Sequence, residues 1–378
     1  MKAILHLSSA CNLRCRYCYA AKHEHGTTMT LETALTAVDL VSREGRGSFC
    51  VSFFGGEPLL HFPLIREVVE AAERLGAERA QRVAFRMSTN GLLFTPELLR
   101  FCGEHQIYFA VSCDGDRTAH DAQRVYPDGR GSFDALAALL PAILSLCPHT
   151  VFTSVITPAS VTALASSMDW MWGQGIRFVA HQLDFADPAW DPESFETLGA
   201  QYRLLADWYL RHTREGEYFY LNLLDDKIKT RVKADFNAAP PCDFGISKVS
   251  VAPDGTLYPC VRFVSDDPRT RDYVIGHVST GFNAARQELS RKNLAPKPAC
   301  ATCAYVGRCI HYCGCNNFTS TGEIDQVHPL VCEHERLLIP LADTLGETLW
   351  RERDPAFLAK HYQIDLRRFP LLGEYDLE

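Results

Sequence analysis

Three cysteines stand close together near the start of the chain, within the stretch SSACNLRCRYCYA. They are Cys11, Cys15 and Cys18. Closely spaced thiolates are ligands for soft metals, so this motif indicates zinc, copper(I) or an iron–sulfur cluster. A structural zinc site needs four ligands, and His23 or His25 would supply the fourth. A [4Fe–4S] cluster held by three cysteines would instead keep one iron open for a substrate or cofactor.

A second group of eight cysteines lies in the last part of the chain. They are Cys242, Cys260, Cys300, Cys303, Cys309, Cys313, Cys315 and Cys332. CxxC pairs of this kind serve zinc ribbons and iron–sulfur clusters alike. The other four cysteines stand singly in apolar stretches, where a thiol behaves as a small hydrophobe, and we expect them in the core. These are Cys50, Cys102, Cys113 and Cys147.

The composition is that of a folded globular protein. With 378 residues, of which 47% are hydrophobic and 11% aromatic, the chain can bury one large core plus a satellite domain, or two medium cores. The net charge of -8 is spread without a Lys/Arg-rich run, so we expect no nucleic-acid partner. No signal peptide or apolar run of about 18 residues is present, so we expect a cytoplasmic protein without a membrane segment.

Strand-like and helix-like segments alternate between the two cysteine groups. Six short segments rich in Val, Phe and Ile end in Gly, Ser, Asn or Asp, as buried parallel strands do. They span residues 2–10, 48–56, 82–90, 107–115, 150–157 and 176–185. Helical patterns lie between them, at residues 31–44, 63–76, 95–106, 132–146 and 160–175. This alternation predicts an α/β fold in which a parallel sheet curls into a full or partial barrel.

The unusual residues follow the ends of the predicted strands. The three cysteines come after the first strand, GGEP at 55–58 after the second, STNG at 88–91 after the third, and Asp114-Gly115 after the fourth. Active sites of such barrels lie at the C-terminal ends of the strands, so these segments are expected to meet at one mouth. Taken alone, GGEP and Asp114-Gly115 would each also fit an ordinary turn.

The order of these motifs resembles the radical SAM superfamily. The likeness is carried by CNLRCRYC, GGEP, STNG and SCDGDRTAHDAQR, and it extends over most of residues 1–215. The resemblance implies a partial (β/α)6 barrel and a [4Fe–4S] cluster held by the first three cysteines. It also implies S-adenosyl-L-methionine chelated to the open iron and cleaved reductively to a 5'-deoxyadenosyl radical. Those three cysteines would then be catalytic.

The resemblance also implies a set of contacts with S-adenosylmethionine. Tyr17 would lie near the adenine, and Gly55, Gly56 and Glu57 would meet the methionine amino group. Ser112 and Asp114 sit where related enzymes contact the ribose or methionyl part. Asn90 and Arg124 complete the expected cofactor-binding residues.

The second cysteine group resembles the seven-cysteine SPASM pattern. The spacings are Cys242-x12-Gly-x4-Cys260, then Cys300-x2-Cys303-x5-Cys309-x3-Cys313, and finally Cys332. The resemblance implies two auxiliary [4Fe–4S] clusters, and hence three in the chain. The first auxiliary cluster would take Cys242, Cys260 and Cys313. The second auxiliary cluster would take Cys300, Cys303, Cys309 and Cys332.

Two departures from related enzymes bear on the reaction. Some relatives supply a further cysteine shortly before the position of Cys242, and this chain has none there. The first auxiliary cluster is therefore closed by Cys315 or keeps an open iron, which would suit a substrate thiolate. Sulfatase-maturing relatives place an Asp directly after the cysteine equivalent to Cys260, where this chain has Val261. That base for a two-electron oxidation is missing.

Three functions remain open from the sequence. The first is a radical SAM oxidoreductase that abstracts hydrogen from a ribosomally made peptide and forms a thioether or similar cross-link. The second is an anaerobic sulfatase-type formylglycine maturase with another base. The third is a non-catalytic iron–sulfur electron carrier, which would need neither an open cluster nor a GGEP pocket.

The expected partners are a peptide or protein substrate and a reductant such as flavodoxin or ferredoxin. Because the first cluster cysteine is already Cys11, we expect either a separate leader-binding protein or direct peptide recognition by the barrel. We expect a barrel over residues 1–215, a linker over 216–239, the SPASM domain over 240–335 and a helical tail over 336–378. The tail is amphipathic and is expected to pack on the barrel.

Overall fold

The computed structural model describes residues 1–19, 27–232 and 242–362. The chain divides into two compact units. The first unit comprises residues 1–113, 120–150 and 243–294. The second comprises residues 114–119, 151–242 and 295–378. The segment after residue 242 forms a continuous sheet with the N-terminal strand, and the expected domain boundaries stay a prediction.

Four parallel strands form the centre of the first unit. In chain order they are β1 (Lys2–His6), β2 (Ser48–Phe54), β3 (Arg82–Thr89) and β4 (Ile107–Ser112), and each pairs with the next. The predicted strands are confirmed. Burial alternates along β4 and the first part of β1, as at Phe109 and Val111 and at Ala3 and Leu5, whereas the five central residues of β2 are all buried. The alternation places one face of the sheet against helices.

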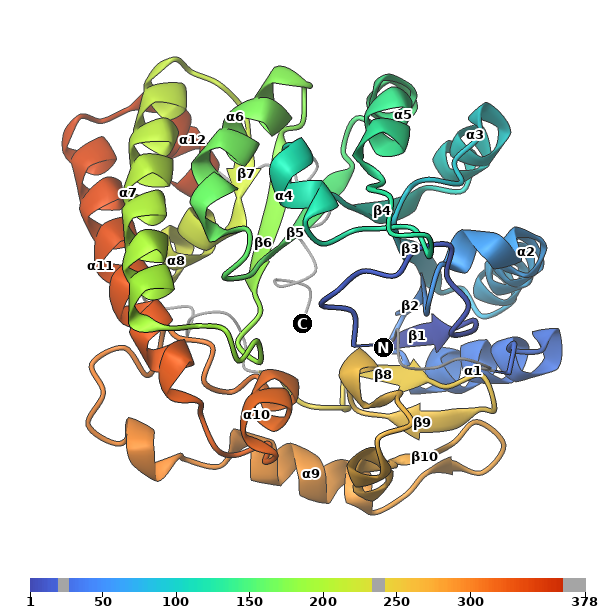
Figure 1. The fold of residues 1–378 in the computed structure, drawn as a ribbon. Helices are drawn as coiled ribbons and strands as arrows, with labels where there is room; N and C mark the ends of the chain where they lie inside the picture. The colour runs from blue at the N-terminus through green and yellow to red at the C-terminus, as the bar shows by residue number, and fades with distance from the viewer. Residues whose placement is uncertain (20–26, 233–241, 363–378) are drawn as a thin grey trace. The chain divides into compact units, whose positions relative to one another are not determined.

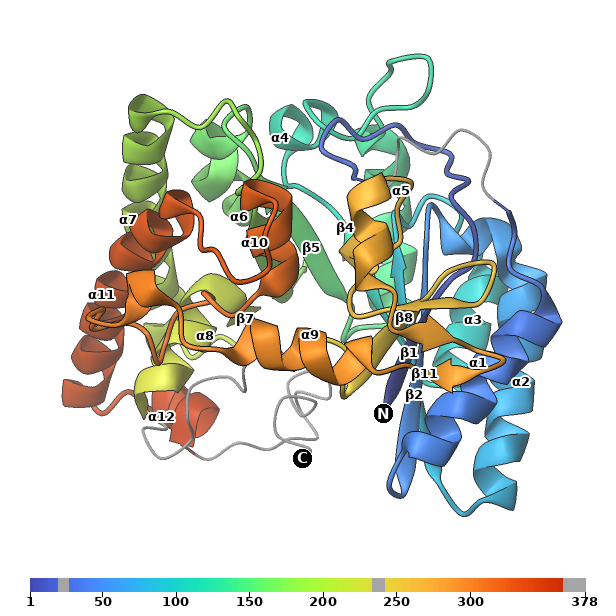
Figure 2. The same cartoon turned by 90° about the horizontal axis from the view of Figure 1, so that it is seen from below.

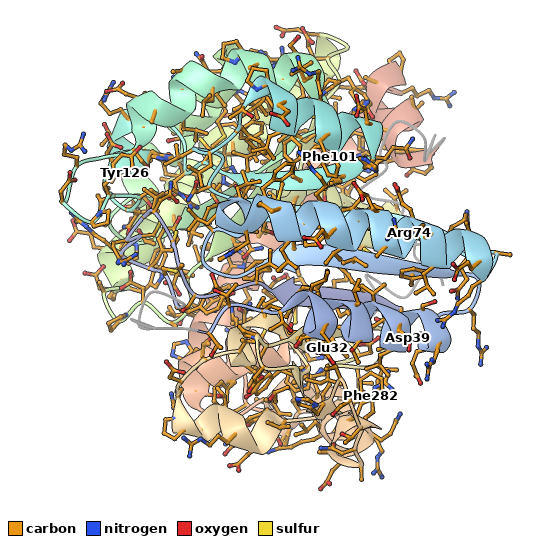
Figure 3. All side chains as sticks on the ribbon, turned by 90° about the vertical axis from the view of Figure 1, so that its right-hand side faces the viewer. Glu32, Asp39, Arg74, Phe101, Tyr126 and Phe282 are labelled. Carbon is orange, nitrogen blue, oxygen red and sulfur yellow. The ribbon has the colours of Figure 1, made fainter. Side chains whose placement is uncertain are left out.

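The helices of the first unit form an outer layer (Figure 1). They are α1 (Leu31–Glu44), α2 (Phe62–Glu78), α3 (Pro96–Glu104) and α5 (Phe133–Leu146), with the short α4 (Arg117–Asp121) at the unit boundary. Figure 3 views this layer with Asp39 on α1, Arg74 on α2 and Phe101 on α3. Thr30 and Thr95 cap α1 and α3 with their side-chain oxygens, as Ser and Thr do at helix starts. The helices predicted at residues 31–44, 63–76, 95–106 and 132–146 are confirmed.

A late segment extends the same sheet on the other side of β1 (Figure 2). The strands are β8 (Lys248–Val251), β9 (Thr256–Tyr258), β10 (Gly276–His277) and β11 (Gly281–Phe282), followed by α9 (Ala285–Leu294). β8 is parallel to β1, with Lys2 opposite Lys248, and β9 and β10 then add antiparallel. The predicted hairpin turns at Gly255, whose φ of 93° suits glycine.

The second unit combines three parallel strands with long helices. The strands are β5 (Val151–Ile156), β6 (Phe178–Leu183) and β7 (Tyr220–Leu221). The helices are α6 (Leu164–Gly173), α7 (Pro192–Arg214), α8 (Asn222–Val232), α10 (Gly314–Thr321), α11 (Pro329–Arg351) and α12 (Pro355–Tyr362). In the described part of the chain, no helix has both the length and the apolar character to cross a bilayer.

The segment expected to be a linker contains β7 and α8. Leu223, Leu224 and Ile228 are buried in α8, at a spacing that places them on one side of the helix. The charged run at residues 225–227 conceals this pattern in the sequence, but two of its side chains are themselves buried and paired. The residues at 233–239 lie outside the described part of the chain.

One of those buried charges, Asp225, links α8 to α12. Asp225 lies 2.7 Å from Lys360 Nζ and 3.2 Å from His361 Nε2, and Tyr209 Oη donates to it over 2.5 Å. The cationic partners and hydrogen bonds outweigh the burial penalty and lower the pKa of Asp225 to about 2. The ionised pair therefore stabilises the fold above the ordinary pKa of aspartate. This contribution is lost as the pH falls through the folded-state value.

We expect Asp225→Asn to loosen α12, because the substitution leaves the Lys360 charge buried without its partner. Breaking such a buried pair costs about 3 kcal/mol. Amide hydrogen exchange across residues 355–362 should accelerate, while exchange in the first unit stays unchanged. Asp226→Asn is the matched control, because the Asp226 carboxylate accepts from Tyr220 instead. Equal exchange in Asp225→Asn and wild type would show that α12 is held without this pair.

Candidate active site and iron–sulfur ligands

The three N-terminal cysteines lie in the loop that follows β1. Cys18 N–H donates to the carbonyl of Cys15 over 3.1 Å, and Leu13 N–H approaches Cys11 Sγ at 3.4 Å. Burial is the main cause that raises the pKa of Cys11, and the nearby Cys18 and Glu57 raise it further. The cysteines are therefore close enough to influence one another. His23 and His25, the alternative zinc ligands, lie outside the described residues.

A second segment of the first unit, residues 120–125, hydrogen-bonds to the backbone of the cysteine loop. We call this segment the HDAQR strap. Arg14 N–H donates to Val125 O over 2.7 Å, and Arg16 N–H donates to Gln123 O over 2.9 Å. These two bonds join Gln123, in the HDAQR motif, and Val125, directly after it, to the backbone between the cysteines. The pairing has no signal in the sequence.

The same backbone pairing places Arg124 beside Tyr17. The Arg124 guanidinium lies 5.2 Å from the centre of the Tyr17 ring, and the Arg124 residue is 6% exposed. A cation over an aromatic face is attracted by the ring quadrupole. These two predicted cofactor contacts are therefore neighbours, and the ring of Tyr17 has a defined position beside the third cysteine.

The GGEP motif packs directly against the cysteine loop. Gly56 N–H donates to Ser8 O and Glu57 N–H to Ala10 O, both over 2.8 Å. A Cβ on Gly55 would lie 2.4 Å from Ser8 O, and one on Gly56 would lie 2.1 Å from Ala10 O. Glycine is required at both positions because the two backbones touch. The motif is thus a backbone contact surface for the cysteine loop.

The Glu57 side chain links the ends of two strands. It is 1% exposed, and its carboxylate accepts from Leu59 N–H at 3.0 Å, Thr89 Oγ1 at 2.7 Å and Asn90 N–H at 2.8 Å. Burial raises the pKa of Glu57, and the three donors partly offset that rise. The carboxylate therefore holds the STNG segment against GGEP.

Asn90 connects this segment to the cysteine loop. Its Nδ2 donates to Asn12 Oδ1 over 2.7 Å and lies 3.9 Å from Cys11 Sγ. Asn12 had not been singled out as a site residue, although a polar residue between two ligands of a loop is a signal of such a role. A hydrogen-bond donor beside a ligand sulfur tunes the metal centre that the sulfur holds.

Ser112 and Asp114 follow β4 but belong to different units. Ser112 ends β4 in the first unit, where it is partly exposed. Asp114 lies in the second unit, and its carboxylate accepts from Val155 N–H over 2.9 Å. Their common role as cofactor contacts stays a prediction.

The four cysteines expected to hold the second auxiliary cluster all lie in the second unit. Burial raises the pKa of Cys300 and of Cys332. Other cysteines of the set lie near each of these two thiols, and their negative charge raises the two pKa values further. Burial raises the pKa of Cys309 to about 12. His311 Nδ1 lies 3.1 Å from Cys309 Sγ. These thiols must lose protons when metal binds.

The cysteines expected at the first auxiliary cluster are divided between the units. Cys260 is in the first unit, and Cys242 and Cys313 are in the second. Within the second unit, Cys313 Sγ and Cys315 Sγ lie 3.5 Å apart at the start of α10. Cys315 can therefore reach a metal held by Cys313. The choice between a closed and an open cluster stays a prediction.

The donor set fits soft-metal clusters, although the thiols are not yet gathered. Among residues 1–19, 27–232 and 242–362, no three His, Cys, Asp or Glu side chains surround one point as metal ligands do. All fifteen cysteines are thiols, and the tight turns at Cys15–Cys18 and Cys300–Cys303 hold pairs of them on the same loop. When bound, the clusters would supply electron transfer and, at the N-terminal loop, an iron site for S-adenosylmethionine.

Comparison with known proteins identifies the N-terminal part. Residues 5–159 match the model of the Radical SAM superfamily. The cysteine-type anaerobic sulfatase-maturating enzyme of Clostridium novyi is 23% identical over 293 residues, covering 72% of this chain and 74% of the relative.

Solved structures match the fold over most of the chain. Native anSMEcpe with bound AdoMet and Cp18Cys peptide superimposes with a TM-score of 0.77 at 17% identity, covering 92% of this chain and 99% of that one. Streptococcus suis SuiB bound to precursor peptide SuiA gives a TM-score of 0.58 at 15% identity, covering 88% and 75%. The predicted α/β class with a partial radical SAM barrel is confirmed. The N-terminal part of the chain therefore matches the Radical SAM superfamily, which implies a [4Fe–4S] cluster and S-adenosylmethionine, and the chain is similar to sulfatase-maturating enzymes in sequence and to anSMEcpe and SuiB in fold.

Proposed function

We propose that this protein is an S-adenosylmethionine-dependent oxidoreductase that joins a cysteine sulfur to a carbon atom within a peptide. The observation that carries the proposal is the convergence of three motifs on the loop of Cys11, Cys15 and Cys18. GGEP and STNG meet that loop through backbone and side-chain hydrogen bonds, and the HDAQR strap fixes its remaining edge. These contacts around the cysteine loop suit a cluster with an open catalytic iron better than a closed cluster that only carries electrons.

A peptide substrate is supported by the structural neighbours. Both anSMEcpe and SuiB have been solved with peptides bound, and their folds match most of this chain. A reductant such as flavodoxin or ferredoxin would supply electrons, and a separate leader-binding protein remains part of the proposal.

A cross-link is favoured over formylglycine formation by the residue beside Cys260. Val261 begins a short 3-10 helix there, and an aliphatic side chain cannot accept a proton. Forming a carbon–sulfur bond breaks one C–H and one S–H bond. A hydrogen atom, a proton and an electron must leave. The bound cofactors would supply the acceptors for the hydrogen atom and the electron.

The three proposed clusters have separable roles. Cys260→Ala should keep cleavage of S-adenosylmethionine but yield no cross-linked peptide, because it removes a ligand of the first auxiliary cluster only. Cys315→Ala should retain all three clusters and some turnover if the substrate sulfur occupies the open iron. Iron per chain, deoxyadenosine and peptide mass are the three readouts. Loss of cluster in Cys315→Ala would instead make Cys315 the fourth ligand.

The product mass separates the candidate reactions. A cysteine-containing peptide incubated anaerobically with the loaded enzyme should lose two hydrogens and keep its sulfur. Loss of sulfur with gain of a carbonyl would establish the formylglycine reaction instead. Absence of deoxyadenosine under reducing conditions would favour an electron carrier.

A further inference from the structure

The second unit contains an open groove between two of its helices. Helices α7 and α11 lie side by side, both with 23 residues (Figure 1). Residues near their N-terminal ends line a groove of about 710 Å³. We call this the α7–α11 groove. It lies one turn from Cys332, on the same helix.

The floor of the α7–α11 groove is apolar. Trp190, Phe195, Leu330 and Leu337 line it, and none of them is fully buried. Trp190 is fixed because its Nε1 donates to Asp184 O over 2.7 Å, and its ring meets Phe195 edge to face at 6.0 Å. Rigid aromatic anchors of this kind are typical of binding surfaces.

A missing side chain creates part of this hollow. Gly199 lies in the middle of α7, and a Cβ there would meet Leu337 at 3.6 Å and Arg203 Nη1 at 3.8 Å. These are ordinary contact distances, so packing does not require glycine. Glycine in a helix interior is unfavourable relative to alanine. The chain thus leaves a space beside Leu337 that an alanine methyl group would fill.

The rim of the groove is acidic. Asp191, Glu196 and Glu333 are exposed along it, against a single basic residue, Arg203. Asp191 accepts from Ser194 N–H as the cap of α7, and this bonding lowers its pKa, so it stays ionised. An occupant with apolar side chains and positive charge would complement both the floor and the rim.

We infer that the α7–α11 groove binds a basic segment of the peptide substrate with apolar side chains, away from the residue that is modified. This inference rests on the proposed peptide substrate and specifies how part of it is recognised. Apolar side chains of the segment lie on Trp190 and Phe195, and its Lys or Arg side chains pair with Glu196 and Glu333. Affinity therefore depends on both groove shape and charge.

The test uses the cluster-loaded enzyme and two synthetic peptides of opposite charge. The basic probe is acetyl-GKLFKLGK-amide, and the matched control is acetyl-GELFELGE-amide. Calorimetry measures affinity, and hydrogen exchange locates the protected segments. We expect the basic probe to bind at least tenfold more tightly and to protect residues 190–203 and 330–337.

Two variants separate shape from charge. Gly199→Leu should fill the floor and weaken binding of the basic probe at least tenfold, while Gly199→Ala, which fits the available space, keeps the fold and raises the melting temperature. Glu196→Gln with Glu333→Gln should weaken the basic probe about fivefold and remove the preference over the acidic one. Glu193→Gln, on the same helix but outside the groove lining, is the control.

Other results would overturn the inference. Equal affinity for both probes, protection elsewhere, or unchanged binding in Gly199→Leu would each contradict it. A concentration-dependent dimer abolished by Gly199→Leu would make a second copy of the chain the occupant. Because binding is measured without turnover, a groove that binds the probe in an enzyme that modifies no peptide would refute the proposed function alone.

Discussion

Cys15→Ala is expected to abolish cleavage of S-adenosylmethionine. Only three thiols hold the proposed N-terminal cluster, and the remaining Cys11 and Cys18 leave two irons without protein ligands. About a third of the bound iron should be lost, since the other cysteine group would still hold two clusters. The HDAQR strap is made by backbone atoms, so the loop should keep its path. Iron per chain and deoxyadenosine after anaerobic reconstitution measure the effect.

The control for this prediction is another cysteine of the first unit. Cys147→Ala removes a half-buried thiol that follows α5 and lies outside both cysteine groups. It should retain full iron and full cleavage. Zinc in place of iron in carefully prepared wild-type protein would overturn the cluster assignment, as would cleavage of S-adenosylmethionine at the wild-type rate by Cys15→Ala.

Glu57→Gln should be the most damaging conservative change beside the cysteine loop. All three partners of the carboxylate donate hydrogen bonds, so a carboxylate satisfies them and an amide cannot. Whichever way the amide turns, its NH2 group faces the backbone N–H of Leu59 or Asn90. An unsatisfied buried donor costs about 1–3 kcal/mol, and loss of a bond to a charged group costs a similar amount.

The damage should appear in both stability and cofactor binding. We expect the free energy of unfolding to fall by about 2–3 kcal/mol. Affinity for S-adenosylmethionine should fall at least tenfold, because Asn90 and GGEP are no longer held together. Denaturant unfolding and calorimetry with the loaded protein measure the two effects. Thr89→Val is the companion variant, because it deletes only one donor. An unchanged affinity in Glu57→Gln would show that the site does not depend on this link.

Most of the fold could be predicted from the sequence because the residue patterns that determine its strands and helices are local. The six predicted strands match β1 to β6, and the strand at residues 82–90 differs from β3 by a single residue. Apolar runs with turn residues at their ends determine such elements through neighbours in sequence. The GGEP and CNLRCRYC motifs are likewise local signals that can be recognised from neighbouring residues alone. The structure places GGEP against the loop that carries the three cysteines.

The unpredicted parts depend on contacts between distant segments. The sequence of residues 123–125 does not indicate that carbonyls of this segment accept hydrogen bonds from the backbone N–H groups of Arg14 and Arg16. The contact of Glu57 with the cofactor stays a prediction, but the hydrogen bonds of its carboxylate to Thr89 and Asn90 depend on a segment distant in sequence. The α8 helix was missed because Asp225 and Lys227 are buried only through partners that arrive much later in the chain.

The position of β1 has a consequence for biosynthesis. One edge of β1 pairs with β2, and the other pairs with β8, whose residues are Lys248–Val251. While the ribosome is still making the intervening chain, the second edge of β1 presents open backbone donors and acceptors next to the cysteine loop, a template for wrong pairing. The nascent protein needs shielding from aggregation until β8 emerges, and a fragment that ends at residue 215 would carry that open edge permanently.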